Sequence, residues 1–370
     1  MVKANVITLN LRSFLFNLFY GLVMWPGNKS SFFQPSGRFA PTPTGDLHVG
    51  NAYSALFALI SANTQDYSTI LRIDDLDLVS LPKGCLESQL EDLAWLGLPF
   101  DEGLKEGGNR GPYRQSERSK YYESAVNYLN KKGLLYPCYC SRKEIAAFAP
   151  HAQDEGFVYP GTCRPNIPNT LDLDEVRQTL RKGRRPTLRF NTTAFQRENS
   201  LEQLKVSPNI QKTRIIGYND LVYGWQEAHL DNSIGDFVIQ RRDGVYAYQL
   251  ACAIDDYLMN CKIVARGADL ITSTHRQRLL LLALDIPQIN LPNYAHAGLI
   301  VDSNGERLAK RNQSTKLKGL REQGLSPSLV RAALSRSLGG PDSDDLKTMF
   351  RQFSWEQISK ESVSWSLTLP

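Results

Sequence analysis

The stretch Gly37–Asn51, with the sequence GRFAPTPTGDLHVGN, constrains the fold of this chain more than any other feature. A strand-like run ends at Ala40, a turn with two prolines follows, and His48 and Gly50 open an apolar helix over residues 49–62. A strand, a turn and a helix in this order predict a βαβ unit and therefore a parallel sheet. The free N–H groups and partial positive charge at a helix start favour phosphate. The stretch therefore predicts a nucleotide site, although a Pro/Gly turn before a helix is common.

The α/β alternation continues on both sides of an irregular middle segment, residues 133–204. We expect strands at 68–73, 236–241 and 262–265, and helices at 86–96, 248–259 and 274–283. The middle segment is interpreted as an insertion in a Rossmann-type sheet. The expected divisions are an N-terminal extension (1–36), a first catalytic half (37–132), the insertion (133–204), a second catalytic half (205–318) and a short helical C-terminal region (319–370).

Composition sets the broad class of the chain. A hydrophobic content of 42% and a charged content of 22% are ordinary for a globular protein with a real core. The net charge of +5 is mild, so it permits contact with a polyanion without arguing for one. Of the six cysteines, three lie within 26 residues of each other and the rest are scattered. This does not resemble a disulfide framework, which favours a reducing, cytoplasmic location. The basic segment Arg177–Arg189 is either a solvated face or an RNA contact.

The N-terminal extension contains an apolar run, Ser13–Trp25, that invites comparison with a membrane or targeting segment. A spanning helix needs about 20 apolar residues, and this run is shorter and is interrupted by Asn17 and Gly21. No A-x-A cleavage pattern follows it. We expect an extension outside the catalytic fold, with a transit peptide as the alternative. We also expect no membrane association and a monomeric protein.

The residues Thr44–Gly50 resemble the T-G-x-x-H-x-G signature of class I aminoacyl-tRNA synthetases, and the preceding R-F-A-P-T-P-T-G string resembles their glutamyl and glutaminyl branch. The resemblance implies that Arg38 binds the carboxylate of glutamate and that His48 stabilises the α-phosphate of ATP. Asn51 departs from the family, in which many members carry a second histidine. The ATP-binding residues implied in this part of the chain are Pro41, Thr44, Gly45, His48, Gly50 and Asn51.

The segment Arg72–Asp77 (RIDDLD) resembles the R-I-E-D-x-D motif of the same family. By spacing alone it could equally be an acidic turn that caps a helix. The resemblance implies that Asp74, one methylene shorter than the usual Glu, contacts the substrate amino group, and that Tyr248 and Arg266 also bind glutamate. Without it, Tyr248 would be a core aromatic and Arg266 part of a surface salt bridge. The complete implied glutamate pocket is Arg38, Phe39, Ala40, Pro41, Thr42, Asp74, Tyr248 and Arg266.

A basic loop, Val301–Gln313, resembles the lysine-bearing K-[ML]-S-K loop of class I synthetases, although such a charge run is more often simply solvated. The resemblance implies that Arg307, Leu308, Ala309 and Lys310 contact ATP. Lys310 is the expected catalytic cation, because it would neutralise the departing pyrophosphate. Ala309 replaces the usual serine.

Cys138, Cys140 and Cys163 lie in the insertion, together with Tyr159. Three thiolates and one further ligand complete a tetrahedral zinc shell, whereas a C-x-C pair alone is more often part of a core. The string Tyr159–Cys163 (YPGTC) resembles the ligand pattern of glutamyl-Q tRNA(Asp) synthetases, which implies one structural Zn²⁺ with the tyrosine as fourth ligand.

The resemblance covers nearly the whole chain from Gly37, and only 60 residues follow Lys310. We do not expect that length to supply the helical anticodon-binding domain of a full glutamyl-tRNA synthetase. The implied function is ATP-dependent activation of L-glutamate without tRNA, followed by transfer to the queuosine base of tRNA(Asp). ATP is expected to bind together with Mg²⁺. The alternatives are a truncated glutamyl-tRNA synthetase that charges a 3′ end and a catalytically inactive paralogue that binds RNA.

Overall fold

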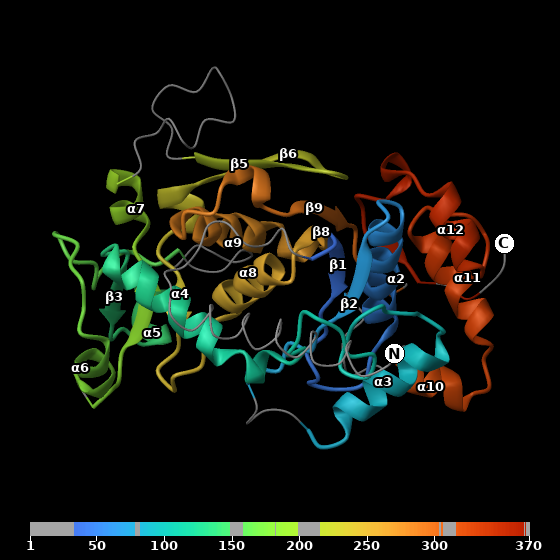
Figure 1. The fold of residues 1–370 in the computed structure, drawn as a ribbon, viewed down its shortest axis with the longest axis horizontal. Coiled ribbons are helices and arrows are strands. Elements are labelled where there is room, and N and C mark those ends of the chain that lie inside the picture. Colours follow the sequence, from blue (N-terminus) through green and yellow to red (C-terminus); the bar gives the residue numbers. More distant parts are fainter. Residues whose placement is uncertain are drawn as a thin grey trace, which may run out of the picture.

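The computed structural model describes residues 33–77, 82–148, 158–181, 183–198, 215–302, 305, 316–365 and 367. A six-stranded sheet runs through the middle of this part of the chain (Figure 1). Its strand order is β2 (Ser68–Leu71), β1 (Ser36–Phe39), β8 (Cys261–Gly267), β9 (Asn293–Ala297), β5 (Ile215–Asp220) and β6 (Gly224–His229). All neighbours pair in parallel except β5 and β6, which are antiparallel. The expected α/β class is confirmed, with a mixed sheet.

The first strand–turn–helix unit forms where the sequence predicts it, from β1 and helix α2 (Val49–Asn63). The helix packs on β1, β2 and β8. Gly37 in β1 permits this close approach, because a Cβ there would lie 2.8 Å from the Cβ of Ala62 and 2.9 Å from the Cγ2 of Ile263. A larger residue would push α2 away from the sheet and so move the turn between them.

The opposite face of the sheet is covered by α8 (Tyr248–Leu258) and α9 (Ile271–Ala283), which pack on each other, and α4 (Ser119–Lys131) packs on α8 (Figure 1). Side chains of β8 alternate between the two faces, as a strand requires. Ile263 and Ala265 join the core beneath α2, whereas Val264 joins a separate cluster on the other side. Strand β8 is therefore buried on both faces, which explains the apolar run Ile263–Ala265 at its centre.

The insertion forms a second, antiparallel sheet of three strands, of which the first two are drawn in green on the left of Figure 1. Its strands are β3 (Leu135–Cys138), β4 (Thr187–Phe190) and β7 (Val238–Gln240), and its helices are α5 (Arg142–Phe148), α6 (Leu173–Gln178) and α7 (Thr192–Glu198). We expected the strand at 236–241 to resume the parallel α/β alternation. That interpretation is wrong, because β7 pairs antiparallel with β4. The chain thus contributes one more strand to the insertion after it has already supplied β5 and β6 to the main sheet.

The C-terminal region packs on α2, on the side that faces away from α8 (Figure 1). It contains α10 (Leu317–Glu322), α11 (Pro327–Ser337), α12 (Leu346–Gln352) and a short parallel pair, β10 (Ile300–Val301) with β11 (Val363–Ser364). Helix α3 (Cys85–Trp95) contacts α10. These contacts bring the segment after the lysine-bearing loop close to the turn between β1 and α2.

The expected boundary after Ser36 divides a strand. Ser36 is fully buried, and its hydroxyl donates to the carbonyl of Met259 at 3.0 Å. The Asn260 amide donates to the carbonyl of Phe33 at 2.8 Å. The fold therefore begins before Gly37. The apolar run Ser13–Trp25 lies outside the described residues, and among those described no helix is long and apolar enough to cross a membrane.

Candidate active site

A hollow of about 750 Å³ opens at the carboxyl ends of β1 and β8. Ligands of open α/β sheets bind at this edge, and the volume lies in the usual range for small-molecule pockets. The hollow brings together every predicted amino-acid and nucleotide residue that the structure describes: Arg38, Phe39, Ala40, Pro41, Thr42, Thr44, Gly45, His48, Gly50, Asn51, Asp74, Tyr248 and Arg266.

The turn between β1 and α2 is held so that the start of the helix faces the hollow. His48 is the N-cap residue, and its backbone N–H donates to the side-chain oxygen of Asn51 at 3.0 Å. A Cβ at Gly50 would come within 3.0 Å of the His48 ring, so glycine leaves room for the imidazole. Gln89 fixes the turn from α3 by donating to the carbonyl of Gly45 at 2.6 Å. No acidic residue stands in the first turn of α2, which suits an anionic ligand.

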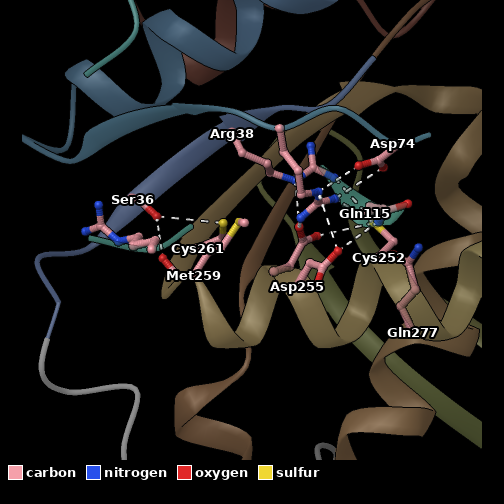
Figure 2. A network of polar contacts seen from close by, with 12 residues as sticks. Ser36, Arg38, Asp74, Gln115, Cys252, Asp255, Met259, Cys261 and Gln277 are labelled. Carbon is pink, nitrogen blue, oxygen red and sulfur yellow. Dashed lines mark hydrogen bonds and ion pairs between the residues drawn. The ribbon is translucent and has the colours of Figure 1, made fainter. Parts of the chain in front are cut away.

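A buried network of arginines and carboxylates forms the floor of the hollow, and Figure 2 shows Arg38, Asp74 and Asp255 within it. Arg38 Nε lies 3.0 Å from Asp256 Oδ1, and Arg72 Nη1 lies 2.6 Å from the same oxygen. Arg72 also binds Asp74 through Nε at 2.7 Å. Charge in this network is balanced inside the protein, because each buried carboxylate has an arginine partner.

Two carboxylates of this network have pKa values shifted in opposite directions. Burial opposes ionisation of Asp256, yet the adjacent Arg38 and Arg72 hold its pKa at about 2. Burial raises the pKa of Asp74 to about 6, although Arg72 acts in the other direction. Because its pKa is about 6, the charge of Asp74 changes just below neutral pH. Asp74 also lines the hollow, so this change in charge occurs where a ligand would bind.

Arg266 differs from Arg38 in having only neutral partners. It is 4% exposed, and no carboxylate among the described residues forms an ion pair with it. Its guanidinium donates to His296 Nε2 at 3.2 Å, to Thr274 Oγ1 at 2.7 Å, to Gln277 Oε1 at 3.0 Å and to the Tyr248 hydroxyl at 3.3 Å. Arg266 is thus no surface salt bridge, and Tyr248, at 37% exposed, is no core aromatic.

The predicted zinc ligands converge in the insertion. The sulfur atoms of Cys138, Cys140 and Cys163 all lie within 4.8 Å of one another. The Tyr159 hydroxyl oxygen lies 3.4 Å from the sulfur of Cys138 and 3.5 Å from that of Cys140. Three sulfur atoms and one oxygen gathered in this way are a donor set that can hold a metal ion. The guanidinium of Arg189 lies 3.9 Å from the centre of the Tyr159 ring and packs on this group.

Comparison with known proteins identifies the family. The family described as "tRNA synthetases class I (E and Q), catalytic domain" matches residues 36–367. The chain belongs to this family. It is therefore an ATP-dependent ligase of the aminoacyl-tRNA synthetase type, as the sequence motifs predicted.

Several relatives of this synthetase carry names that state an activity. The chain is 40% identical to the glutamyl-Q tRNA(Asp) synthetase of Symbiobacterium thermophilum, over 88% of this chain and 94% of that protein. It is 37% identical to the protein of the same name from Nitratidesulfovibrio vulgaris, over 82% of this chain and 86% of that one. It is also 38% identical to glutamate–tRNA ligase 2 of Alkalilimnicola ehrlichii, over 81% of this chain and 57% of that one.

A solved structure agrees with these matches. The crystal structure of a glutamate tRNA ligase from Elizabethkingia meningosepticum, in complex with its amino acid, superposes with a TM-score of 0.71 at 27% identity. The superposition covers 90% of this chain and 68% of that one. The class I synthetase fold of the chain is therefore supported by both sequence and structure.

The lysine-bearing loop of this synthetase lies largely outside the described residues, including Arg307, Leu308, Ala309 and Lys310. The position of its far end is described. The Lys316 ammonium lies 3.2 Å from Asp46, and the backbone N–H of Leu317 donates to the carbonyl of Leu47 at 2.9 Å. The loop therefore returns to the turn that precedes His48.

A second hollow of about 630 Å³ adjoins the first and shares Thr42, Asp74 and Tyr248 with it. Its outer wall is formed by residues of the insertion, including strand β7, and by the turn that follows β7. That wall carries the basic side chains Arg142, Arg189, Arg241 and Arg242. The same lining carries Asp74, Asp77 and Asp243, and Arg241 is paired with the last two at 2.9 and 2.5 Å. The second hollow is therefore mixed in charge.

Sequence reasoning missed several buried polar residues of the site: Arg118, Asp220, Cys252, Asp255, Asp256 and His296. One signal was available, because the adjacent pair Asp255 and Asp256 interrupts an otherwise apolar helix, α8. Charged residues in such a helix are buried only when they are paired. His296 and Asp220 gave no comparable signal, since each is a single polar residue near a strand end.

Proposed function

We propose that this synthetase activates L-glutamate with ATP, without tRNA, and then transfers the glutamyl group to the queuosine base at the wobble position of the tRNA(Asp) anticodon. In the first step an α-carboxylate oxygen of glutamate attacks the α-phosphorus of ATP. The bond to the bridging oxygen breaks, and glutamyl-adenylate and pyrophosphate form. In the second step a queuosine hydroxyl attacks the adenylate carbonyl, loses its proton and releases AMP.

The first step assigns roles to residues that line the hollow. Arg38 and Arg266 bind glutamate through its carboxylates, and Asp74 binds its ammonium group. His48, at the start of α2, stabilises the charge that develops on the α-phosphate. Lys310 neutralises the charge of the departing pyrophosphate, and Mg²⁺ would accompany ATP and offset part of the same charge.

One observation carries the preference for glutamate. The Arg266 guanidinium is buried, faces the hollow and has only neutral partners among the described residues. A buried cation of this kind favours an anionic ligand, because a carboxylate offers a bidentate, charge-assisted pair. Glutamate can offer a side-chain carboxylate in addition to the reacting one, whereas glutamine cannot.

The proposed acceptor rests on the two relatives named glutamyl-Q tRNA(Asp) synthetase, which the chain matches over 94% and 86% of their lengths. The second hollow supports it, since it adjoins the amino-acid pocket and carries Arg142, Arg189 and Arg242, whose positive charges suit the phosphates around a nucleotide. The insertion that forms this wall would be held by one structural Zn²⁺, with Cys138, Cys140, Tyr159 and Cys163 as ligands. Zinc would fix their arrangement and take no part in the chemistry.

ATP–pyrophosphate exchange tests the activation step. Glutamate alone should support exchange without tRNA, and aspartate or glutamine should support it far less. Arg38→Ala should reduce exchange by an amount equivalent to roughly 2–5 kcal/mol, because it removes a buried partner of the substrate carboxylate. A wild-type protein without exchange would favour the inactive, RNA-binding alternative, and an undiminished Arg38→Ala variant would reject the assignment of that residue.

Transfer of labelled glutamate tests the acceptor. The substrates are tRNA(Asp) in its native form, in a queuosine-free form and in a native form trimmed of its 3′ terminal adenosine. We expect labelling of the first and third only. The second candidate function, charging of a 3′ end, is favoured by the similarity to glutamate–tRNA ligases. It predicts labelling of the queuosine-free tRNA and loss of labelling on trimming.

A further inference from the structure

Three residues from three neighbouring strands form a line that ends at the active-site hollow. Asp220 is the last residue of β5, His296 lies in β9 and Arg266 lies in β8. Arg266 and His296 are paired residues in the ladder between β8 and β9. All three residues are buried, with exposed fractions of 1% for Asp220, 0% for His296 and 4% for Arg266. Only Arg266 lines the hollow.

The hydrogen bonds along this line fix where the imidazole proton lies. Asp220 Oδ2 lies 2.6 Å from His296 Nδ1, and the opposite ring nitrogen, Nε2, lies 3.2 Å from the Nε of Arg266. The guanidinium can only donate, so Nε2 must accept. The imidazole is therefore neutral, with its proton on Nδ1 and directed at Asp220. Burial lowers the pKa of His296, which agrees with a neutral ring.

The orientation of Asp220 is itself determined by the backbone. Its Oδ1 accepts from the N–H groups of Val222 at 3.0 Å, Tyr223 at 2.9 Å and His296 at 3.3 Å. Its Oδ2 is thereby left for the imidazole. Burial opposes the charge of Asp220, but the bonds from His296 and the backbone lower its pKa, so the carboxylate is ionised.

We propose that Asp220 and His296 are positioning residues that hold the Arg266 guanidinium in place for the carboxylate of the amino-acid substrate. The proposal rests on the proposed function, in which Arg266 binds glutamate. Asp220 selects the imidazole tautomer, and the imidazole supplies the acceptor that fixes Arg266 Nε. The other guanidinium nitrogens, held by Thr274, Gln277 and Tyr248, then have a single orientation toward the hollow. The line thus contributes to the discrimination between glutamate and glutamine.

Asp220→Asn tests this proposal with almost no change in shape. The three backbone N–H groups keep the amide oxygen at the Oδ1 position, so the new NH₂ group faces His296 Nδ1. The ring must then accept at Nδ1 and carry its proton on Nε2, directly against the Arg266 N–H. We expect the KM for glutamate in ATP–pyrophosphate exchange to rise by about 10- to 100-fold, the range known for residues that orient metal ligands through a hydrogen bond. The kcat and the KM for ATP should change by less than about threefold, because a contact made equally in ground and transition states affects mainly KM.

Asp236→Asn is the matched control, since Asp236 is a buried carboxylate of the insertion that accepts from Arg164, Tyr136 and Thr192. It should leave the KM for glutamate unchanged.

If Asp220→Asn does not fold, the pair His296→Gln and His296→Leu replaces it. The side chain introduced in His296→Gln can still accept a hydrogen bond from Arg266, whereas leucine cannot. The His296→Gln variant should therefore have a lower KM for glutamate than His296→Leu. It should also discriminate more strongly between the substrates glutamate and glutamine.

Two outcomes overturn the proposal: a folded Asp220→Asn variant with the wild-type KM for glutamate, or His296→Gln and His296→Leu variants with the same KM. Equal increases in the KM for glutamate and for ATP would also overturn it, since they indicate a general structural effect. The proposed function fails separately, if the wild-type protein itself shows no exchange with glutamate.

Discussion

The side chains of Asp46 and Lys316 meet at 3.2 Å although 270 positions separate them in the sequence. Asp46 belongs to the turn before His48, and Lys316 ends the loop that carries Lys310. A hydrogen bond from Ser88 to Asp46 at 3.1 Å ties α3 to the same point. One ion pair therefore joins the turn before His48 to the end of the loop that carries Lys310. These are the two elements expected to bind the phosphates of ATP.

Breaking this ion pair should affect ATP more than glutamate. We expect Lys316→Met to raise the KM for ATP in exchange by up to about fivefold, which corresponds to the loss of roughly 1 kcal/mol from a partly exposed pair. The KM for glutamate should not change. Lys132→Met is the control, because Lys132 forms a similar pair with Asp285 at 2.8 Å, outside both hollows. An unchanged KM for ATP in Lys316→Met, or an equal rise in both variants, would contradict the idea.

Two truncations that differ by four residues test where the catalytic fold begins. Removal of Met1–Phe32 should leave exchange activity and the melting temperature nearly unchanged, because the match to the family's catalytic domain begins at residue 36. Removal of Met1–Ser36 should lower the free energy of unfolding by more than about 1 kcal/mol, since it deletes the buried hydroxyl of Ser36 and its hydrogen bond. Thermal and urea unfolding measure the difference. A collapse of the shorter truncation would show that the extension itself stabilises the core.

Local features of the fold were predictable because they depend on neighbours in sequence. Helix α2 starts at Val49 as predicted, since the turn, the cap and the apolar period are all contained in one stretch. The position of β7 in the fold was not predictable, because the sequence of a three-residue strand does not indicate which strand it pairs with. Its pairing with β4 joins residues about 50 positions apart.

The candidate site shows the same division between local and distant information. Arg38, His48 and Arg266 were found through motifs, and all three line one hollow. The residues that hold them were not found, because Asp256 and Asp220 meet their partners only after the sheet has formed. A motif identifies the side chain that meets the ligand, whereas its support depends on which strands become neighbours.

The cysteine group should bind one metal ion. We expect about one zinc per chain by elemental analysis after purification without chelators, because the four donors form one tetrahedral set. Cys140→Ser should lose the metal. Cys85→Ser should retain it, since Cys85 lies in α3 and is not part of the group. Wild-type protein without metal would identify the group as a cluster of core cysteines.

The pH dependence of glutamate binding should reflect Asp74. Its pKa is raised to about 6 by burial, so the carboxylate is charged above pH 6 and increasingly neutral below it. The substrate ammonium group is charged throughout this range and needs an anionic partner. We therefore expect the KM for glutamate in exchange to be constant above about pH 7 and to rise as the pH falls through 6, whereas the KM for ATP should not follow this course.

Two variants separate Asp74 from other groups that titrate in the same range. Asp74→Asn should have a high KM for glutamate at all pH values and no inflection near pH 6, because the amide carries no charge to lose. Asp92→Asn should keep the inflection, although burial raises the pKa of Asp92 to about 6 as well, because Asp92 lies in α3 and does not line the hollow. The opposite result is an inflection that persists in Asp74→Asn and disappears in Asp92→Asn. It would assign the titration to the contact between α3 and α10. Another group would then have to bind the ammonium of glutamate.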